Sequence, residues 1–170
     1  NEAEKRLSNP KLRDDFFAKH ANDQDMLNLI HRVLSSYACE DWIGITEALC
    51  LSSSETVVDL GGGRGVLLEE IGEAVSNRIL VDRPEVLKEL ELDGVRVQPL
   101  DIFKDDIPAG DVYILSRVLH DWDDTKCIHL LMRLPRSSRV IVIDRTAEPG
   151  KHGLLSLNML LVSGGRERTK

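Results

Sequence analysis

The sequence predicts an α/β domain built on an open parallel sheet, and three observations support this. Short runs rich in Val, Ile and Leu alternate with amphipathic stretches from residue 56 onward. A glycine-rich turn, residues 61–65, follows the first of these runs. Polar residues stand at or just beyond the end of each run. Because β-α-β alternation gives parallel strands joined by right-handed crossovers, we expect a ligand at the carboxyl edge of the sheet.

Two helices are predicted ahead of the sheet. Pro10 begins a helical pattern that runs to about His20, since proline is favoured in the first helical turn. A second pattern, with apolar residues at helical spacing, begins after Asp23. We therefore divide the chain into an N-terminal helical segment, residues 1–52, and a ligand-binding domain, residues 53–170.

Five strands and four further helices are predicted in the second region. The strand-like runs are 56–60, 78–82, 95–99, 111–116 and 139–144. Helical patterns occupy 65–75, 84–91, 123–134 and 153–163. The polar residues that fall at the strand ends are Asp59, Asp82, Asp101, Arg117 and Asp144.

The composition narrows the class of partner. The chain has 170 residues, 42% of them hydrophobic, which is enough for one domain with a core. A net charge of −7 disfavours a nucleic-acid backbone as partner. No apolar run approaches the roughly 20 residues of a membrane helix, and the polar start does not resemble a signal peptide. The three cysteines match no metal-site spacing. We expect a cytoplasmic protein without a metal.

The glycine turn predicts a nucleoside-bearing cofactor. Gly61, Gly63 and Gly65 can take positive φ or leave room where a Cβ would collide, which brings bare backbone against a ligand. A dinucleotide and S-adenosylmethionine (SAM) are the two candidates. Nicotinamide dehydrogenases space their glycines as G-x-G-x-x-G, whereas this turn runs G-x-G-x-G after Asp59, which favours SAM. The alternative interpretation of the glycine turn is a tight strand-to-helix connection that binds no ligand.

Two further strand-end acids fit the same cofactor. Asp82 offers only acceptors and could receive both hydroxyls of a ribose; the structural alternative is a helix N-cap ahead of Pro84. Asp101 could accept from an adenine amino group while Ile102 packs on the ring face.

His120 is the candidate catalytic residue. It follows the fourth predicted strand, where side chains face the ligand crevice. An isolated histidine is more often a surface or core residue. The cluster that it forms with Arg117, Asp121 and Trp122 favours a functional role.

These motifs, in this order, resemble the signatures of the SAM-dependent O-methyltransferase family, which includes plant caffeic acid and flavonoid enzymes and the animal acetylserotonin enzyme. The resemblance extends over residues 56–169 and rests on segments 59–65, 82–86, 101–103, 117–122, 156–160 and 164–169. It implies a Rossmann-like class I methyltransferase sheet of order 3-2-1-4-5, with N-terminal covering helices. Family members continue beyond the last residue of this chain, so we expect a fragment that lacks the last two strands.

The resemblance also implies a role for each site residue. The implied cofactor site, for SAM or its product S-adenosylhomocysteine (SAH), comprises Asp59, Gly61, Gly63, Asp82, Asp101, Ile102 and Arg117. The two glycines would contact the methionine part, Asp82 the ribose, and Asp101 with Ile102 the adenine. His120 corresponds to the general base, and Asp144 to the acid that orients it.

The implied reaction is methyl transfer to a hydroxyl of a small, aromatic or polyketide-like molecule. A phenol has a pKa of about 10 and histidine about 6.5, so full proton transfer before attack would cost about 5 kcal/mol. A carboxylate at Asp144 or Asp121 would reduce that cost. The full-length protein is expected to be a homodimer. A SAM-binding or dimerising module without catalysis is the alternative function.

Overall fold

The computed structural model describes residues 23, 25, 26, 29, 32, 42, 44–146, 165 and 167–169. The predicted helices at 10–20 and 153–163 lie outside these residues. Asp23 caps a helix, because its Oδ1 accepts from the Met26 backbone N–H at 3.0 Å, and residues 25, 26, 29 and 32 are helical. The helix predicted after Asp23 therefore begins as expected.

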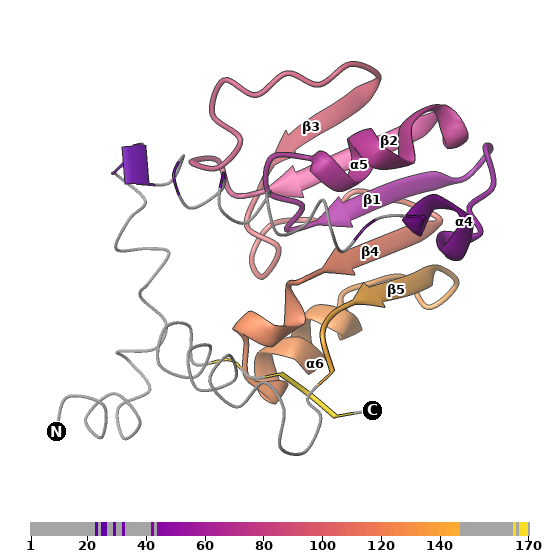
Figure 1. Ribbon diagram of the computed structural model, residues 1–170. Coiled ribbons are helices and arrows are strands. Elements are labelled where there is room, and N and C mark those ends of the chain that lie inside the picture. Colours follow the sequence, from indigo (N-terminus) through magenta and orange to yellow (C-terminus); the bar gives the residue numbers. More distant parts are fainter. Residues whose placement is uncertain are drawn as a thin grey trace, which may run out of the picture.

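A parallel five-stranded sheet forms the centre of the molecule (Figure 1), as the sequence predicts. Its strands are β1 (Thr56–Leu60), β2 (Asn77–Asp82), β3 (Val95–Pro99), β4 (Val112–Ser116) and β5 (Arg139–Ile143). Their order is β3-β2-β1-β4-β5, so the order reverses between β1 and β4. The carboxyl ends of these two strands therefore flank the crevice in which open α/β sheets bind ligands.

Helices cover both faces of the sheet. They are α4 (Ile45–Leu49), α5 (Val66–Ile71) and α6 (Asp124–Met132), with short 3-10 turns η2 (Gly72–Ala74) and η3 (Leu119–Asp121). Helices α4 and α5 pack on one face and α6 on the other (Figure 1). Asp123 begins α6 by accepting from the Lys126 backbone N–H at 2.9 Å, which is the start the sequence predicts. No helix among the described residues is long and apolar enough to cross a membrane.

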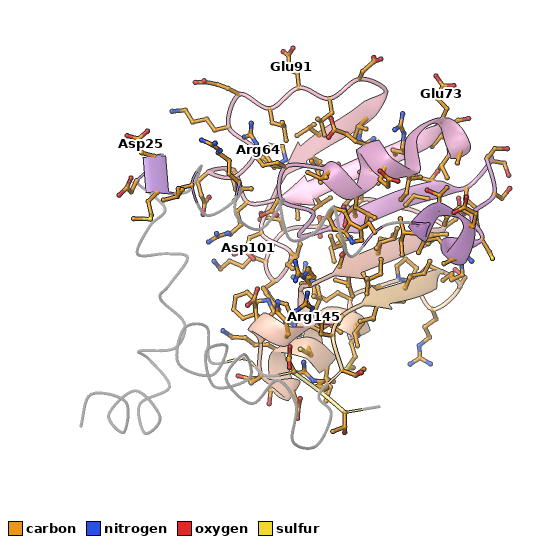
Figure 2. The ribbon with its side chains drawn as sticks, viewed as in Figure 1. Asp25, Arg64, Glu73, Glu91, Asp101 and Arg145 are labelled. Carbon is orange, nitrogen blue, oxygen red and sulfur yellow. The ribbon has the colours of Figure 1, made fainter. Side chains whose placement is uncertain are left out.

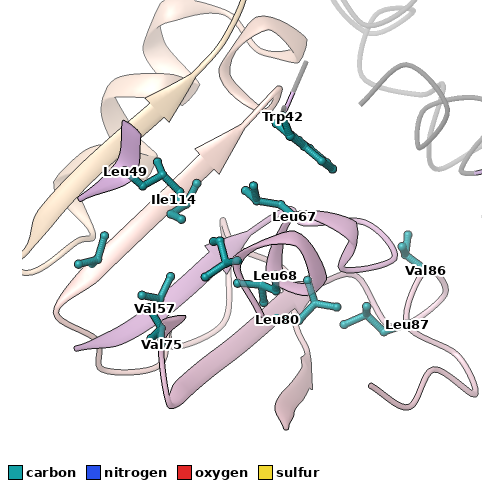
Figure 3. Packing of buried hydrophobic residues seen from close by; sticks show 12 residues of the cluster. Trp42, Leu49, Val57, Leu67, Leu68, Val75, Leu80, Val86, Leu87 and Ile114 are labelled. Carbon is teal, nitrogen blue, oxygen red and sulfur yellow. The ribbon is translucent and has the colours of Figure 1, made fainter. Parts of the chain in front are cut away.

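The core lies in two layers, one on each side of the sheet. Along β4, Val112 and Ile114 face the α5 layer, whereas Tyr113 and Leu115 face the α6 layer. Every residue of β4 is buried, as expected for a central parallel strand. Figure 3 shows the α5 layer, in which Trp42 packs with strand and helix side chains. This packing fixes the strand ends that carry the site.

The predicted helix at 84–91 is wrong. The segment makes two successive turns. In the first, the Leu87 N–H donates to the Arg83 carbonyl at 3.1 Å; in the second, the Leu90 N–H donates to the Leu87 carbonyl at 3.1 Å, and Glu89 takes a left-handed φ of 57°. Val86 and Leu87 are only 2% and 3% exposed because both insert into the core beside α5. Burial of these two side chains outweighs the local helical preference.

Candidate functional site

The glycine turn brings the β1 loop against the β4 loop. Gly61 and Gly63 have φ values of 74° and 59°, which side chains rarely adopt. The Gly61 N–H donates to the Val81 carbonyl at 2.8 Å, and a Cβ at Gly61 would lie 2.9 Å from Val118 Cγ2. The expected bare-backbone turn is present, and it stands where the strand order reverses.

Asp59 lies directly beneath this turn. It is 1% exposed, and neither carboxylate oxygen has a hydrogen-bond partner among the described residues. Burial, with a smaller contribution from the charge of Asp82, raises the pKa of Asp59 to about 7. A Cβ at Gly62 would overlap Asp59 Oδ2, so the middle glycine makes room for this acid. Sequence reasoning missed Gly62, although three consecutive glycines were a signal.

Asp82 links the end of β2 to the glycine turn. Its Oδ2 accepts from the Gly63 N–H at 2.8 Å, and its Oδ1 accepts from the Arg83 N–H at 2.7 Å. Burial raises the pKa of Asp82 to about 6, although these two hydrogen bonds oppose the rise. No helix follows Pro84, so the helix N-cap reading of Asp82 is wrong. This carboxylate remains the candidate ribose acceptor.

Asp101 stands at the same edge, beyond β3, within its own turn. Its Oδ1 accepts from the Phe103 N–H at 2.9 Å, and its Oδ2 pairs with Lys104 Nζ at 2.7 Å. Partial burial would raise the pKa of Asp101, but the hydrogen bonds from Lys104 and Phe103 and the charges of Lys104 and Arg83 together outweigh it, so the pKa lies below its usual range. Ile102 packs against the apolar cluster on the α6 face. Figure 2 shows Asp101 and Arg64 on the side toward which the strands point.

His120 and Asp144 come together from β4 and β5. Asp144 Oδ1 lies 2.7 Å from His120 Nδ1, and Asp144 Oδ2 accepts from the His120 backbone N–H at 3.2 Å. Asp121 is farther away, with its Oδ1 at 3.8 Å from His120 Nε2. Of the two carboxylates that the sequence left open, Asp144 therefore makes the close contact.

The electrostatic surroundings of His120 favour its charged form. Burial alone would lower the pKa of the imidazole, since the side chain is only 17% exposed. The Asp144 hydrogen bond and the charges of Asp121 and Asp144 outweigh burial, while Arg117 opposes them. The net result is a pKa above the usual histidine value.

Arg117 marks the turn that carries the chain from β4 to His120. Its φ is 57°, a left-handed conformation that is uncommon outside glycine. Its backbone N–H donates to the Ile143 carbonyl at 2.8 Å, which joins the ends of β4 and β5. This link keeps the residue before Asp144 in register with the His120 loop.

Sequence reasoning missed the contribution of Gly165 and residues 167–169. A Cβ at Gly165 would overlap the His120 carbonyl oxygen, and the Arg168 guanidinium binds the loop around His120. Glu167, between them, is 7% exposed. The sequence showed these residues as a motif, but no local pattern indicated which segment they would contact 45 residues away.

Within the described part of the chain, no group of three or more His, Cys, Asp or Glu side chains could hold a metal ion. The comparison with known families decides the relationship, because the family model of the O-methyltransferase domain matches residues 13–170. The chain belongs to the O-methyltransferase domain family. Its sheet order, β3-β2-β1-β4-β5, agrees with the fold of class I SAM methyltransferases.

Individual relatives extend this result. The acetylserotonin O-methyltransferase of Macaca mulatta is 36% identical over 143 residues, which cover 74% of this chain. The human N-acetylserotonin methyltransferase, solved in complex with SAM, superposes with a TM-score of 0.80 at 31% identity over 91% of this chain. An O-methyltransferase from neocarzinostatin biosynthesis was solved with SAM and 2-hydroxy-5-methyl naphthoic acid. It superposes with a TM-score of 0.78 at 28% identity over 90% of this chain.

This member of the O-methyltransferase domain family spans only part of the length of these relatives. It spans 41% of the macaque enzyme, 50% of the human structure and 51% of the neocarzinostatin enzyme. The family match, residues 13–170, includes the parallel sheet, the glycine turn and the His120 loop of this chain.

Proposed function

We propose that this protein is a SAM-dependent O-methyltransferase that methylates a hydroxyl of a small, aromatic or polyketide-like molecule. The observation that carries the proposal is the contact of 2.7 Å between His120 Nδ1 and Asp144, at the crevice beside the glycine turn. Because Nδ1 is engaged by the carboxylate, Nε2 is the nitrogen that can receive a substrate proton.

The residues at the sheet edge fit the cofactor. Gly61 and Gly63 present backbone without side chains, and Asp82 is an acceptor-only group beside them. Asp59, buried without a hydrogen-bond partner among the described residues, lies against Gly62 beneath the turn that would hold the cofactor. SAM, when bound, supplies a methyl group activated by its sulfonium.

The outer part of the proposed cofactor site is formed by three residues. Asp101 is assigned to the adenine amino group, and Ile102 to the ring face. The Asp101 carboxylate already binds Phe103 and Lys104, so an adenine would have to share or displace the exposed Lys104 side chain. Arg117, at the turn after β4, is assigned to holding the cofactor.

His120 would remove the proton from the acceptor hydroxyl as the hydroxyl oxygen takes the methyl group, with SAH as the leaving group. The pKa of His120 lies above its usual value, which brings it closer to the pKa of about 10 of a phenol. The cost of proton transfer is therefore lower than the roughly 5 kcal/mol of an unperturbed pair. Asp144 would hold the ring and stabilise its protonated form.

Other parts of the proposal concern the whole protein. We assign residues 1–52 to covering the substrate and residues 53–170 to binding the cofactor. The full-length protein is proposed to be a homodimer, as the family resemblance implies. A cytoplasmic location is proposed from the composition and the cysteine pattern.

The test compares His120→Ala with His129→Ala, a matched control at an exposed histidine of α6. Methyl transfer from labelled SAM to N-acetylserotonin and hydroxynaphthoic acids would be measured, and SAH binding would be followed by calorimetry. We expect His120→Ala to lose about 100-fold or more in rate with SAH affinity unchanged, and His129→Ala to retain both. Full activity in His120→Ala would exclude the base. SAH binding without transfer to any hydroxyl would favour the non-catalytic alternative.

A further inference from the structure

The loop that carries His120 is held from two sides. On one side, Asp144 binds the His120 ring and backbone. On the other side, Gly165 packs so closely that a Cβ there would overlap the His120 carbonyl oxygen. The second contact comes from a part of the chain about 45 residues beyond the loop, and it has no role in the proposed function described above.

Arg168 makes the specific contacts of this second side. Its Nη1 donates to the Leu119 carbonyl at 2.8 Å, and its Nη2 donates to the Trp122 carbonyl at 3.0 Å. These two carbonyls bracket His120: Leu119 is the first residue of the η3 turn, and Trp122 directly follows its last residue. The guanidinium also pairs with Asp124 Oδ1, at 2.9 Å from Nη2 and 3.1 Å from Nε.

The chemistry of arginine suits this arrangement. A guanidinium carries five donors in a rigid planar fork, so one side chain can bind two carbonyls and a carboxylate at fixed angles. The Leu119 carbonyl also accepts from the Trp122 N–H at 3.2 Å and from Cys127 Sγ at 3.3 Å, both within the same part of the chain. Arg168 therefore adds the contact that ties this turn to a distant segment. A lysine ammonium is a single point of donation, so it could not reproduce the bridge between the two carbonyls.

We propose that Arg168 is a positioning residue for the reaction, which fixes the η3 turn so that the His120 ring stays on Asp144. This inference rests on the proposed role of His120 as the base. Arg168 itself touches the loop backbone and not the imidazole. Its loss would let the turn relax and would lengthen the contact between His120 and Asp144.

The titration of His120 reports this positioning without any substrate. The charged groups that face His120 are Asp121 and Asp144, which raise its pKa, and Arg117, which lowers it. Asp124 and Glu167 lie in the segments that contact each other beside the loop. If the Asp144 contact loosens, the pKa of His120 falls toward its ordinary value, and the acid limb of the rate moves to lower pH.

The experiment compares Arg168→Ala and Arg168→Lys in the full chain, with Arg136→Ala as control at an exposed arginine. NMR titration of labelled histidine gives the pKa of His120, and Asp144→Asn calibrates complete loss of the contact. For Arg168→Ala we expect a pKa fall of about half a unit or more and a fall in kcat of about tenfold or more, with KM for SAM within twofold. Arg168→Lys should recover only part of the His120 pKa and of kcat. Arg136→Ala should have the same His120 pKa and kcat as the parent protein.

A normal His120 pKa and normal kcat in folded Arg168→Ala would overturn the proposal. Asp124→Asn removes the ion pair but leaves both carbonyl contacts, so an equal effect there would assign the role to the ion pair and overturn it too. If circular dichroism shows that Arg168→Ala is unfolded, the folded Arg168→Lys variant decides by the same two measurements. The NMR titration needs no turnover. If His120→Ala kept full activity, the base role would fail, but the effect of Arg168 on the His120 pKa could still be measured.

Discussion

The imidazole of His120 shows how one neighbour sets the chemistry of a residue. Asp144 engages Nδ1 and the backbone N–H of the same residue, so both the ring orientation and the tautomer are defined. Asp121, the nearest acid in the sequence, contributes charge but no close hydrogen bond. The side chain of Asp144 is therefore long enough to reach the ring.

Asp59 represents the opposite case, a buried acid whose charge no hydrogen bond stabilises among the described residues. Its carboxylate has no hydrogen-bond partner among the described residues, and Asp82 adds a second negative charge nearby. Its pKa of about 7, raised from 3.8, means that the folded state holds a proton that the unfolded state releases above pH 4. The associated stability is complete below about pH 4 and is lost as the pH rises through about 7.

Asp59→Asn is therefore expected to stabilise the chain without cofactor at pH 8, because the amide avoids the buried charge. The shift corresponds to at most about 4 kcal/mol in the free energy of unfolding. Urea unfolding at pH 5 and pH 8 measures the effect, with Asp93→Asn as an exposed control. Equal stabilities of parent and Asp59→Asn at pH 8 would contradict the buried-charge account.

Helix α5 shows how two glycines set the limits of an element. Gly65 precedes its first residue with a φ of 82°, and Gly72 ends it with a φ of 55°. The two positions differ in their surroundings. A Cβ at Gly65 would overlap Leu92 Cδ1, whereas a Cβ at Gly72 would meet no atom within 4 Å.

This pair separates backbone strain from steric overlap. Gly72→Ala should cost about 1 kcal/mol in the free energy of unfolding, from the strained φ alone. Gly65→Ala should cost about 1–3 kcal/mol more, because Leu92 must also move. Chemical denaturation of the two variants measures the difference. Equal losses would show that Leu92 yields without cost.

The segment between β2 and β3 shows where element prediction from sequence fails. Its apolar residues have helical spacing, yet only two successive turns form, and Glu89 adopts a left-handed φ. Val86 and Leu87 are drawn into the α5 layer of the core, and Arg64 Nη1 donates to the Val86 carbonyl at 3.1 Å. The carbonyl is thus satisfied by a side chain from the glycine turn instead of by a helix.

At the scale of the whole molecule, the reversal of strand order gathers the site. The carboxyl ends of all five strands lie at the same edge of the sheet, toward which the strands point in Figure 1. The loops that follow the strands therefore begin at this edge. Figure 2 places Arg64, Asp101 and Arg145 on this side and Glu73 at the opposite end. A ligand bound at that edge would contact several elements together, so its binding should stabilise the whole fold.

We expect SAH to raise the thermal midpoint, by an amount equivalent to about 2.7 kcal/mol at a concentration of 100 times Kd. Asp82 has a pKa of about 6, and its protonated form loses acceptors for the ribose hydroxyls. The stabilisation should therefore decrease as the pH falls through about 6. Scanning fluorimetry from pH 5 to pH 8 measures it, and Asp82→Asn should show a small response at every pH. A response in Asp82→Asn as large as in the parent would contradict the ribose assignment.

The sequence by itself determined the class of fold and its strands, because alternating short apolar runs and amphipathic stretches admit few other packings. It also located the glycine turn, Asp82 and His120, since strand ends of a parallel sheet lie at one edge. These are local patterns combined with a general rule of topology, so they can be read without coordinates.

Only the tertiary structure decided which groups meet. It brought Asp144, and not Asp121, to His120, placed Asp59 beneath Gly62, and set Arg168 on the carbonyls around the His120 loop. It also converted the predicted helix at 84–91 into turns. The physical reason is the same in each case: burial, close packing and long-range hydrogen bonds depend on segments that are distant in the chain, and no local pattern encodes their distance.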